Sequence, residues 1–140
     1  MDGIRVDRRA HTRGFHVADV LEAVGDRART SVWRCRIGET VVGEEFWDHE
    51  EHLESACSGG RDISGENLLT LARQTMQVID GEFIACETGS AEPWLVLVIY
   101  DSSYWEALSS DTDVMEALKG RFPWFKPIRE EERTYPWGRS

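Results

Sequence analysis

The segment from Trp94 to Tyr100 constrains the fold most strongly, because seven consecutive residues there are apolar or aromatic. Such a run is far shorter than the ~20 residues that a membrane helix needs. Its length and continuity are typical of a β-strand that is covered on both faces. We therefore expect a sheet in which this strand occupies a central position and has a neighbour on each side.

Short links around this strand predict antiparallel pairing. Three consecutive strands are expected at residues 81–87, 94–100 and 104–108. Upstream, residues 31–37 alternate in polarity as a half-buried strand does, and a turn at Gly38-Glu39 predicts a hairpin whose returning strand covers residues 40–46. The sequence thus predicts a sheet of about five strands.

Four further segments have apolar residues at helical spacing. They are residues 16–28, residues 47–57, residues 64–79 after a Ser64 N-cap, and a last segment that begins at Asp111 or Thr112 and stops before Gly120. The order of elements predicts an α+β fold, with a mainly antiparallel sheet and three to four helices packed mostly on one face. We expect a single domain over residues 1–128, with an irregular arm or short edge strand at 1–15. The C-terminal tail, 129–140, is expected to be loosely ordered.

Charge is distributed unevenly along the chain. The net charge is −10, and residues 37–115 contain seventeen Asp and Glu but only Arg61 and Arg73. This balance disfavours nucleic acids and anionic membrane surfaces as partners, since both need cations on the protein. It favours a basic protein partner or simple solubility. Because the two ends of the chain are mildly basic, a self-complementary homodimer is also compatible with the pattern.

The three cysteines, Cys35, Cys57 and Cys86, contain no C-x-x-C pair, and their number is odd. These features fit reduced thiols better than a disulfide framework, and the sequence starts without a secretory signal pattern. We therefore expect a cytoplasmic protein. Cys35 and Cys86 fall at core-facing positions of expected strands, whereas Cys57 precedes Ser58-Gly59-Gly60 and is expected to be the most exposed of the three.

The strongest candidate for function is an acidic, aromatic segment. It combines Trp47 with six carboxylates, and its predicted interaction residues are Glu44, Glu45, Trp47, Asp48, Glu50, Glu51 and Glu54. Negative charge can steer a basic partner, and a buried aromatic side chain can anchor it. Immunity-like inhibitors of cationic nucleases need this property, which is a physical analogy and not a sequence match. The pattern favours a non-enzymatic protein-interaction module or inhibitor without a cofactor.

Two alternatives belong to other classes. If residues 47–57 are helical, Glu45, His49 and His52 would share one stripe and could hold Zn, Mn or Fe in a small metal-dependent enzyme. The H-E-x-x-H signature is absent, however. The third class is a small-molecule-binding domain with a pocket under Trp33, Trp94 or Trp105.

Overall fold

Strand β5, Pro93–Tyr100, occupies the centre of the sheet. The computed structural model describes residues 1–7 and 17–138, and these form a seven-stranded sheet in the order β3-β2-β4-β5-β6-β1-β7. Every neighbouring pair of strands is antiparallel. All residues from Trp94 to Ile99 are buried, so the prediction of a central strand covered on both faces is confirmed.

The described residues form seven strands and five α-helices, joined in places by short 3-10 turns. The strands are β1 Gly3–Asp7, β2 Val32–Val42, β3 Asp62–Ser64, β4 Thr75–Cys86, β5 Pro93–Tyr100, β6 Tyr104–Leu108 and β7 Lys126–Ile128. The helices are α1 Val17–Val24, α2 Asp26–Thr30, α3 Leu53–Cys57, α4 Gly65–Gln74 and α5 Thr112–Arg121. The 3-10 turns are η2 Glu44–Phe46, η3 Ser58–Gly60 and η4 Glu130–Glu132.

The α+β class and the antiparallel sheet are confirmed, but the expected number of about five strands is wrong. The predicted hairpin at Gly38 does not form, because β2 continues through this position as one long strand. Its pairing with β4 instead shifts register between Ile37 and Glu39, so the extra residue is absorbed as an irregularity in the ladder. The sequence does not predict the three-residue strands β3 and β7, and it predicts the region of β1 only as an irregular arm or short edge strand, whereas β1 lies inside the sheet between β6 and β7.

Local sequence signals account for most helix boundaries. Gly25 has a φ of 88°, a conformation that glycine adopts readily, and it separates α1 from α2. The Ser64 side chain accepts a hydrogen bond from the backbone N–H of Asn67, as expected of an N-cap. The Asp111 carboxylate caps α5 in the same way. Helix α4 ends at Gln74 rather than at residue 79, because the chain from Thr75 onward pairs with β2.

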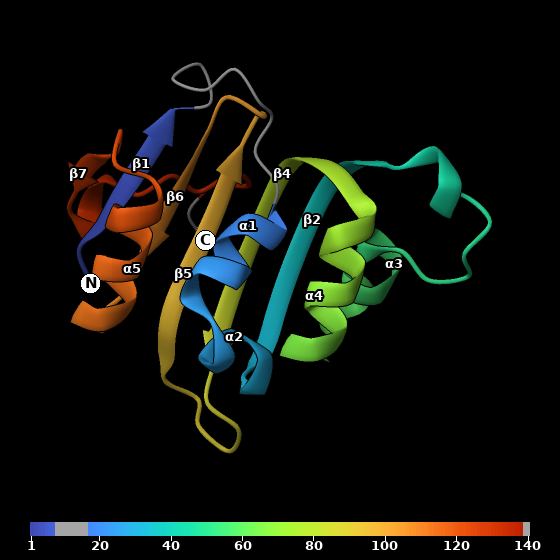
Figure 1. The fold of residues 1–140 in the computed structure, drawn as a ribbon, viewed down its shortest axis with the longest axis horizontal. Helices are drawn as coiled ribbons and strands as arrows, with labels where there is room; N and C mark the ends of the chain where they lie inside the picture. Colours follow the sequence, from blue (N-terminus) through green and yellow to red (C-terminus); the bar gives the residue numbers. More distant parts are fainter. Residues whose placement is uncertain (8–16, 139–140) are drawn as a thin grey trace.

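The helices cover one face of the sheet. Figure 1 shows α1, α2, α4 and α5 lying in front of the strands. Side chains from all five helices join one face of the sheet in a single hydrophobic cluster that includes Trp33, Phe83 and Trp105. Four residues form a smaller cluster on the other face, namely Val96, Val98, Leu108 and Ile128. None of the helices in the described ranges is both long and apolar enough to span a bilayer.

Strand β1 and the C-terminal segment, which we define as residues 129–138, both lie next to β6. The C-terminal segment lies on the face of the sheet that no α-helix of the described residues covers, which we call the helix-free face. Strand β1 lies between β6 and β7, and residues 8–15 of the predicted N-terminal arm lie outside the described residues. The C-terminal segment passes behind the sheet in Figure 1. Arg133 forms an ion pair with Glu82 of β4, and the Arg36 guanidinium lies 4.3 Å from the centre of the Trp137 ring. These contacts attach the segment to the helix-free face.

Candidate functional site

The predicted acidic segment forms a projecting loop, which we call the acidic arm and define as residues 43–52. It leaves the sheet where β2 ends at Val42 and returns where α3 begins at Leu53. Only the 3-10 turn η2 interrupts its irregular path. Figure 1 shows the arm as the teal loop that stands outside the edge of the sheet next to β2. Because it contains few apolar side chains, most of this stretch has no face to bury against the core.

Hydrogen bonds fix both ends of the acidic arm. The backbone N–H of Gly43 donates to the Gln74 carbonyl at 3.1 Å. At the other end, His52 is the N-cap of α3, and its backbone N–H donates to the Ser55 hydroxyl at 3.0 Å. The His52 Nε2 atom lies 2.7 Å from the Phe46 carbonyl oxygen. These contacts attach one end of the arm to the end of α4 and the other end to the start of α3.

The carboxylates of the predicted interaction surface are all exposed. The Glu51 carboxylate accepts a hydrogen bond from Asn67 at 3.2 Å. The Glu54 carboxylate accepts two from Thr40, from its backbone N–H at 2.8 Å and its hydroxyl at 3.0 Å. The other four carboxylates have no ion-pair partner within the part of the chain that the structure describes; they belong to Glu44, Glu45, Asp48 and Glu50. Their negative field is therefore directed to solvent.

Trp47 lies among these carboxylates with 64% of its surface exposed, the largest fraction among the exposed large hydrophobic residues. Its indole Nε1 donates to the Val42 carbonyl at 3.2 Å, which orients the ring. Two other exposed apolar side chains, Val41 and Met76, lie at the adjoining ends of β2 and β4 from which the arm emerges. Exposed apolar area is thus concentrated beside the acidic arm.

The predicted metal-binding stripe does not form. Residues 47–52 are not helical and α3 begins only at Leu53, so the expected helix over 47–57 is wrong in extent. Glu45, His49 and His52 consequently do not share a helical face, and the His52 ring already contacts the Phe46 carbonyl. Within residues 1–7 and 17–138, no three His, Cys, Asp or Glu side chains are grouped so that they could hold a metal ion.

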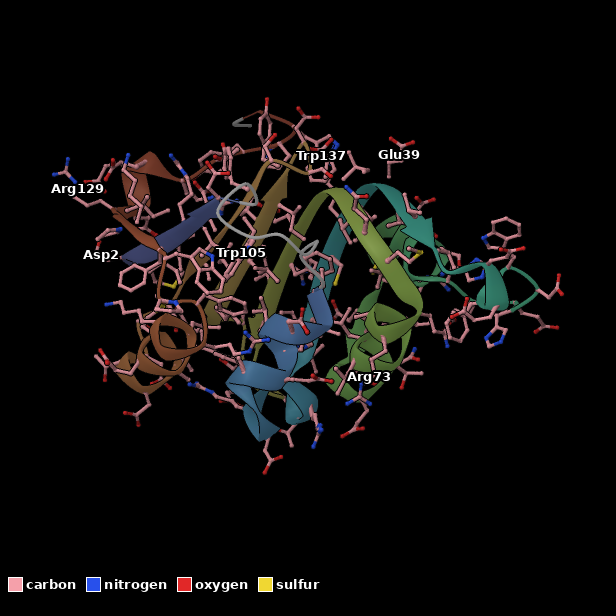
Figure 2. The ribbon with its side chains drawn as sticks, turned by 45° about the horizontal axis from the view of Figure 1, so that its top comes forward. Asp2, Glu39, Arg73, Trp105, Arg129 and Trp137 are labelled. Atoms are coloured by element: carbon pink, nitrogen blue, oxygen red, sulfur yellow. The ribbon has the colours of Figure 1, made fainter. Side chains whose placement is uncertain are left out.

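The three tryptophans of the proposed ligand pocket lie in the main hydrophobic cluster and are at most 4% exposed. Trp33 and Trp94 pack edge to face, and Trp33 Nε1 donates to the Ala28 carbonyl at 2.9 Å. Trp105 packs edge to face on Phe122. Figure 2 shows Trp105 within the molecule, while Trp137 lies near Glu39 at its surface. The three rings therefore belong to the hydrophobic core.

One hollow lies on the helix-free face, over β2 and β4, and another lies at the edge of β2 next to η3. The first, of about 640 Å³, separates the C-terminal segment from the strands and is lined by Arg36, Glu82 and Trp137 among others. The second, of about 550 Å³, lies toward η3 and shares Arg36 and Glu82 with the first. Their walls carry both signs of charge, so they do not favour one class of ionic ligand.

A buried carboxylate that sequence reasoning missed lies beneath the C-terminal segment. Glu106 of β6 is fully buried. The Arg5 guanidinium approaches Glu106 Oε2 to 2.6 Å, and Thr134 donates its backbone N–H to Oε1 at 2.7 Å. The Thr134 hydroxyl donates to Oε2 at 3.2 Å, and the Tyr104 hydroxyl lies 2.6 Å from that hydroxyl. We call these four residues, Arg5, Tyr104, Glu106 and Thr134, the Glu106 network.

Comparisons with protein-family models, with curated proteins and with solved structures each found no match to this chain.

Proposed function

We propose that this protein is a non-enzymatic interaction module that binds a basic protein partner through the acidic arm. The observation that carries the proposal is the projecting arm itself, in which four carboxylates without ion-pair partners among the described residues surround the 64% exposed Trp47. Charged groups at an interface steer the encounter, and a desolvated aromatic side chain supplies much of the affinity.

The shape of the arm supports an inhibitory role. A projecting acidic loop with an aromatic residue can enter a concave cationic groove, whereas a flat acidic face cannot. The substrate-binding groove of a nuclease is of this kind, because it must neutralise phosphates. We therefore propose an immunity-like inhibitor as the specific form of this function, with the arm occupying the groove of its target. Val41 and Met76, exposed at the base of the arm, would extend the apolar part of the contact.

Charge reversal in the arm should slow association with the partner. The test compares wild type with Glu45→Lys/Glu50→Lys, after the partner has been identified by cross-linking in source cells and purified. We expect the association rate at low salt to fall by about ten-fold or more, and its dependence on salt to flatten. The measurement is surface-based or stopped-flow kinetics over a series of salt concentrations.

The matched control is Glu92→Lys/Glu116→Lys, which changes the net charge equally at two exposed positions outside the arm. Equal slowing by both double variants would attribute the effect to net charge and would contradict a role for the arm. The same purified samples, examined by sedimentation, also report whether the chain forms the homodimer that its charge pattern allows.

Replacing Trp47 by alanine should weaken binding while leaving the fold intact. We expect a loss of about 2 kcal/mol in binding free energy, on the order of 30-fold in Kd. The free energy of unfolding should change by less than about 0.5 kcal/mol, since the ring is mostly exposed. Calorimetric titration and urea unfolding measure the two quantities. The control is Trp124→Ala, beside the opposite edge of the sheet, which should leave the Kd unchanged. If the Kd is also unchanged in Trp47→Ala, then Trp47 is not part of the interface.

A further inference from the structure

Two of the three cysteines meet where α3 packs on β2. Strand β3 pairs with β2 only from Val32 to Arg34, and α3 contacts β2 as well. This packing brings Cys57, the last residue of α3, close to Cys35 of β2 in the main hydrophobic cluster, and each thiol has the largest effect on the pKa of the other. Both are buried, with 3% and 4% of their surfaces exposed. Cys86 is half-buried near the end of β4 and is not part of this pair.

A small reagent can approach this pair at the edge of the sheet, where β2 extends beyond its pairing with β3. Both cysteines line the hollow of about 550 Å³ next to η3. The rim of the hollow includes Arg34, Ser58 and Gly59, all of which are exposed. The thiols are therefore buried from bulk solvent on average, yet they border a space large enough for a molecule such as hydrogen peroxide.

The surroundings of the two thiols shift their pKa values in opposite directions. The neighbouring Cys35 thiol lowers the pKa of Cys57, against the opposing effects of burial and of the Glu51 carboxylate. The pKa of Cys35 is raised, first by the Cys57 thiol and then by burial. Cys57 is therefore the thiol that ionises first, and Cys35 keeps its proton beside it. A thiolate next to a protonated thiol is the arrangement that disulfide chemistry uses.

We propose that Cys35 and Cys57 form a reversible disulfide when the protein meets a peroxide. The Cys57 thiolate attacks one peroxide oxygen, the O–O bond breaks, and Cys57 becomes a sulfenic acid as hydroxide leaves. The Cys35 sulfur then attacks the Cys57 sulfur, the S–O bond breaks, and hydroxide leaves again. The two protons of the reacting groups convert both hydroxides to water. In total, two thiols lose two electrons and hydrogen peroxide is reduced to two waters.

The Cys35–Cys57 disulfide would restrict the acidic arm, because the arm lies entirely between the two cysteines in the chain. Oxidation would close the stretch from Cys35 to Cys57 into a covalent loop and would fix α3, which anchors one end of the arm, to β2. We expect the oxidised protein to have a Tm roughly 5–15 °C above that of the reduced protein, because the cross-link restricts the unfolded chain. The chemistry of the pair does not depend on which partner the arm binds.

The test treats reduced, natively folded protein with hydrogen peroxide and then counts the free thiols by alkylation and intact mass. We expect two of the three thiols to be lost. Peptide mapping should show a Cys35–Cys57 linkage in a monomer, and a thiol reductant should restore both thiols and the lower Tm. Cys86→Ser should form the same linkage at the same rate, whereas Cys57→Ser should form no intramolecular disulfide.

Three results would overturn the proposal. One is a linkage through Cys86 or between two chains. Another is oxidation of Cys57 beyond the sulfenic acid without formation of a disulfide. The last is oxidation that occurs in urea but not in the folded protein, which would show that the native hollow does not admit peroxide.

Discussion

Replacing Glu106 by alanine should lower the free energy of unfolding by about 3 kcal/mol and release the C-terminal segment from the sheet. Glu106 is fully buried, and its carboxylate accepts hydrogen bonds from Arg5 and from both the backbone and the hydroxyl of Thr134. Its removal leaves several donors without an acceptor. The Arg5 side chain is 30% exposed and can reach water, which limits the loss to the lower end of the range for a broken buried pair.

Urea unfolding gives the stability, and limited proteolysis of residues 129–138 gives the release of the segment. Glu106→Gln keeps the shape and one acceptor oxygen, so its effect should be intermediate. Glu116→Ala removes an exposed carboxylate and should change the stability by less than about 0.5 kcal/mol. If Glu106→Ala and Glu116→Ala unfold at the same urea concentration, the Glu106 network contributes nothing measurable to the fold.

Replacing Gly65 by alanine should destabilise the protein by about 3 kcal/mol, because the first turn of α4 lies directly against the end of α2. A Cβ atom at Gly65 would lie 1.8 Å from the Ala28 carbonyl oxygen and 2.7 Å from that of Arg29. These atoms are backbone and cannot rotate away. The Ala28 carbonyl also accepts the hydrogen bond from Trp33 Nε1, so moving it disturbs the core.

The control for this substitution is Gly120→Ala in α5, where nothing lies within 4 Å of the added Cβ atom. Alanine there should stabilise the protein by up to about 1 kcal/mol through its better helix propensity. Thermal and urea unfolding of both variants measure the difference. A Gly65→Ala protein as stable as wild type would mean that α2 and α4 can separate without cost.

The sequence predicted best the elements whose partners are close along the chain. The strands at 94–100 and 104–108 and the last helix were located correctly, because short turns and a cap mark their ends. For residues 75–79 the sequence pattern predicts a helix, since Met76 and Ile79 also fit a helical face. In the structure these residues instead belong to β4, because they pair with β2. This pairing cannot be read from the local sequence, since β2 lies more than thirty residues away.

The candidate functional residues show the same contrast between features that the local sequence reveals and features that tertiary packing determines. The acidity of the arm is visible in the sequence, and every residue of the predicted interaction surface is exposed, but its binding role stays a prediction. Cys57 was expected to be the most exposed cysteine, which is wrong, because α3 packs it onto β2. Glu106 was overlooked although it alternates with Trp105 and Ala107 in a strand, a phase that places its side chain on the helix-free face.

The position of β1 has a consequence for how the chain assembles in time. Its residues pair with β6 on one side and β7 on the other, so that Gly3 lies opposite both Leu108 and Ile128. The β4-β5-β6 meander contains only local pairings and can form early, whereas inserting β1 requires a large loop to close first. During synthesis, β1 therefore emerges well before both of the strands with which it pairs. Until β1 is inserted, the apolar Ile4 and Val6 have no strand beside them, and the far edge of β6 stays open to other chains.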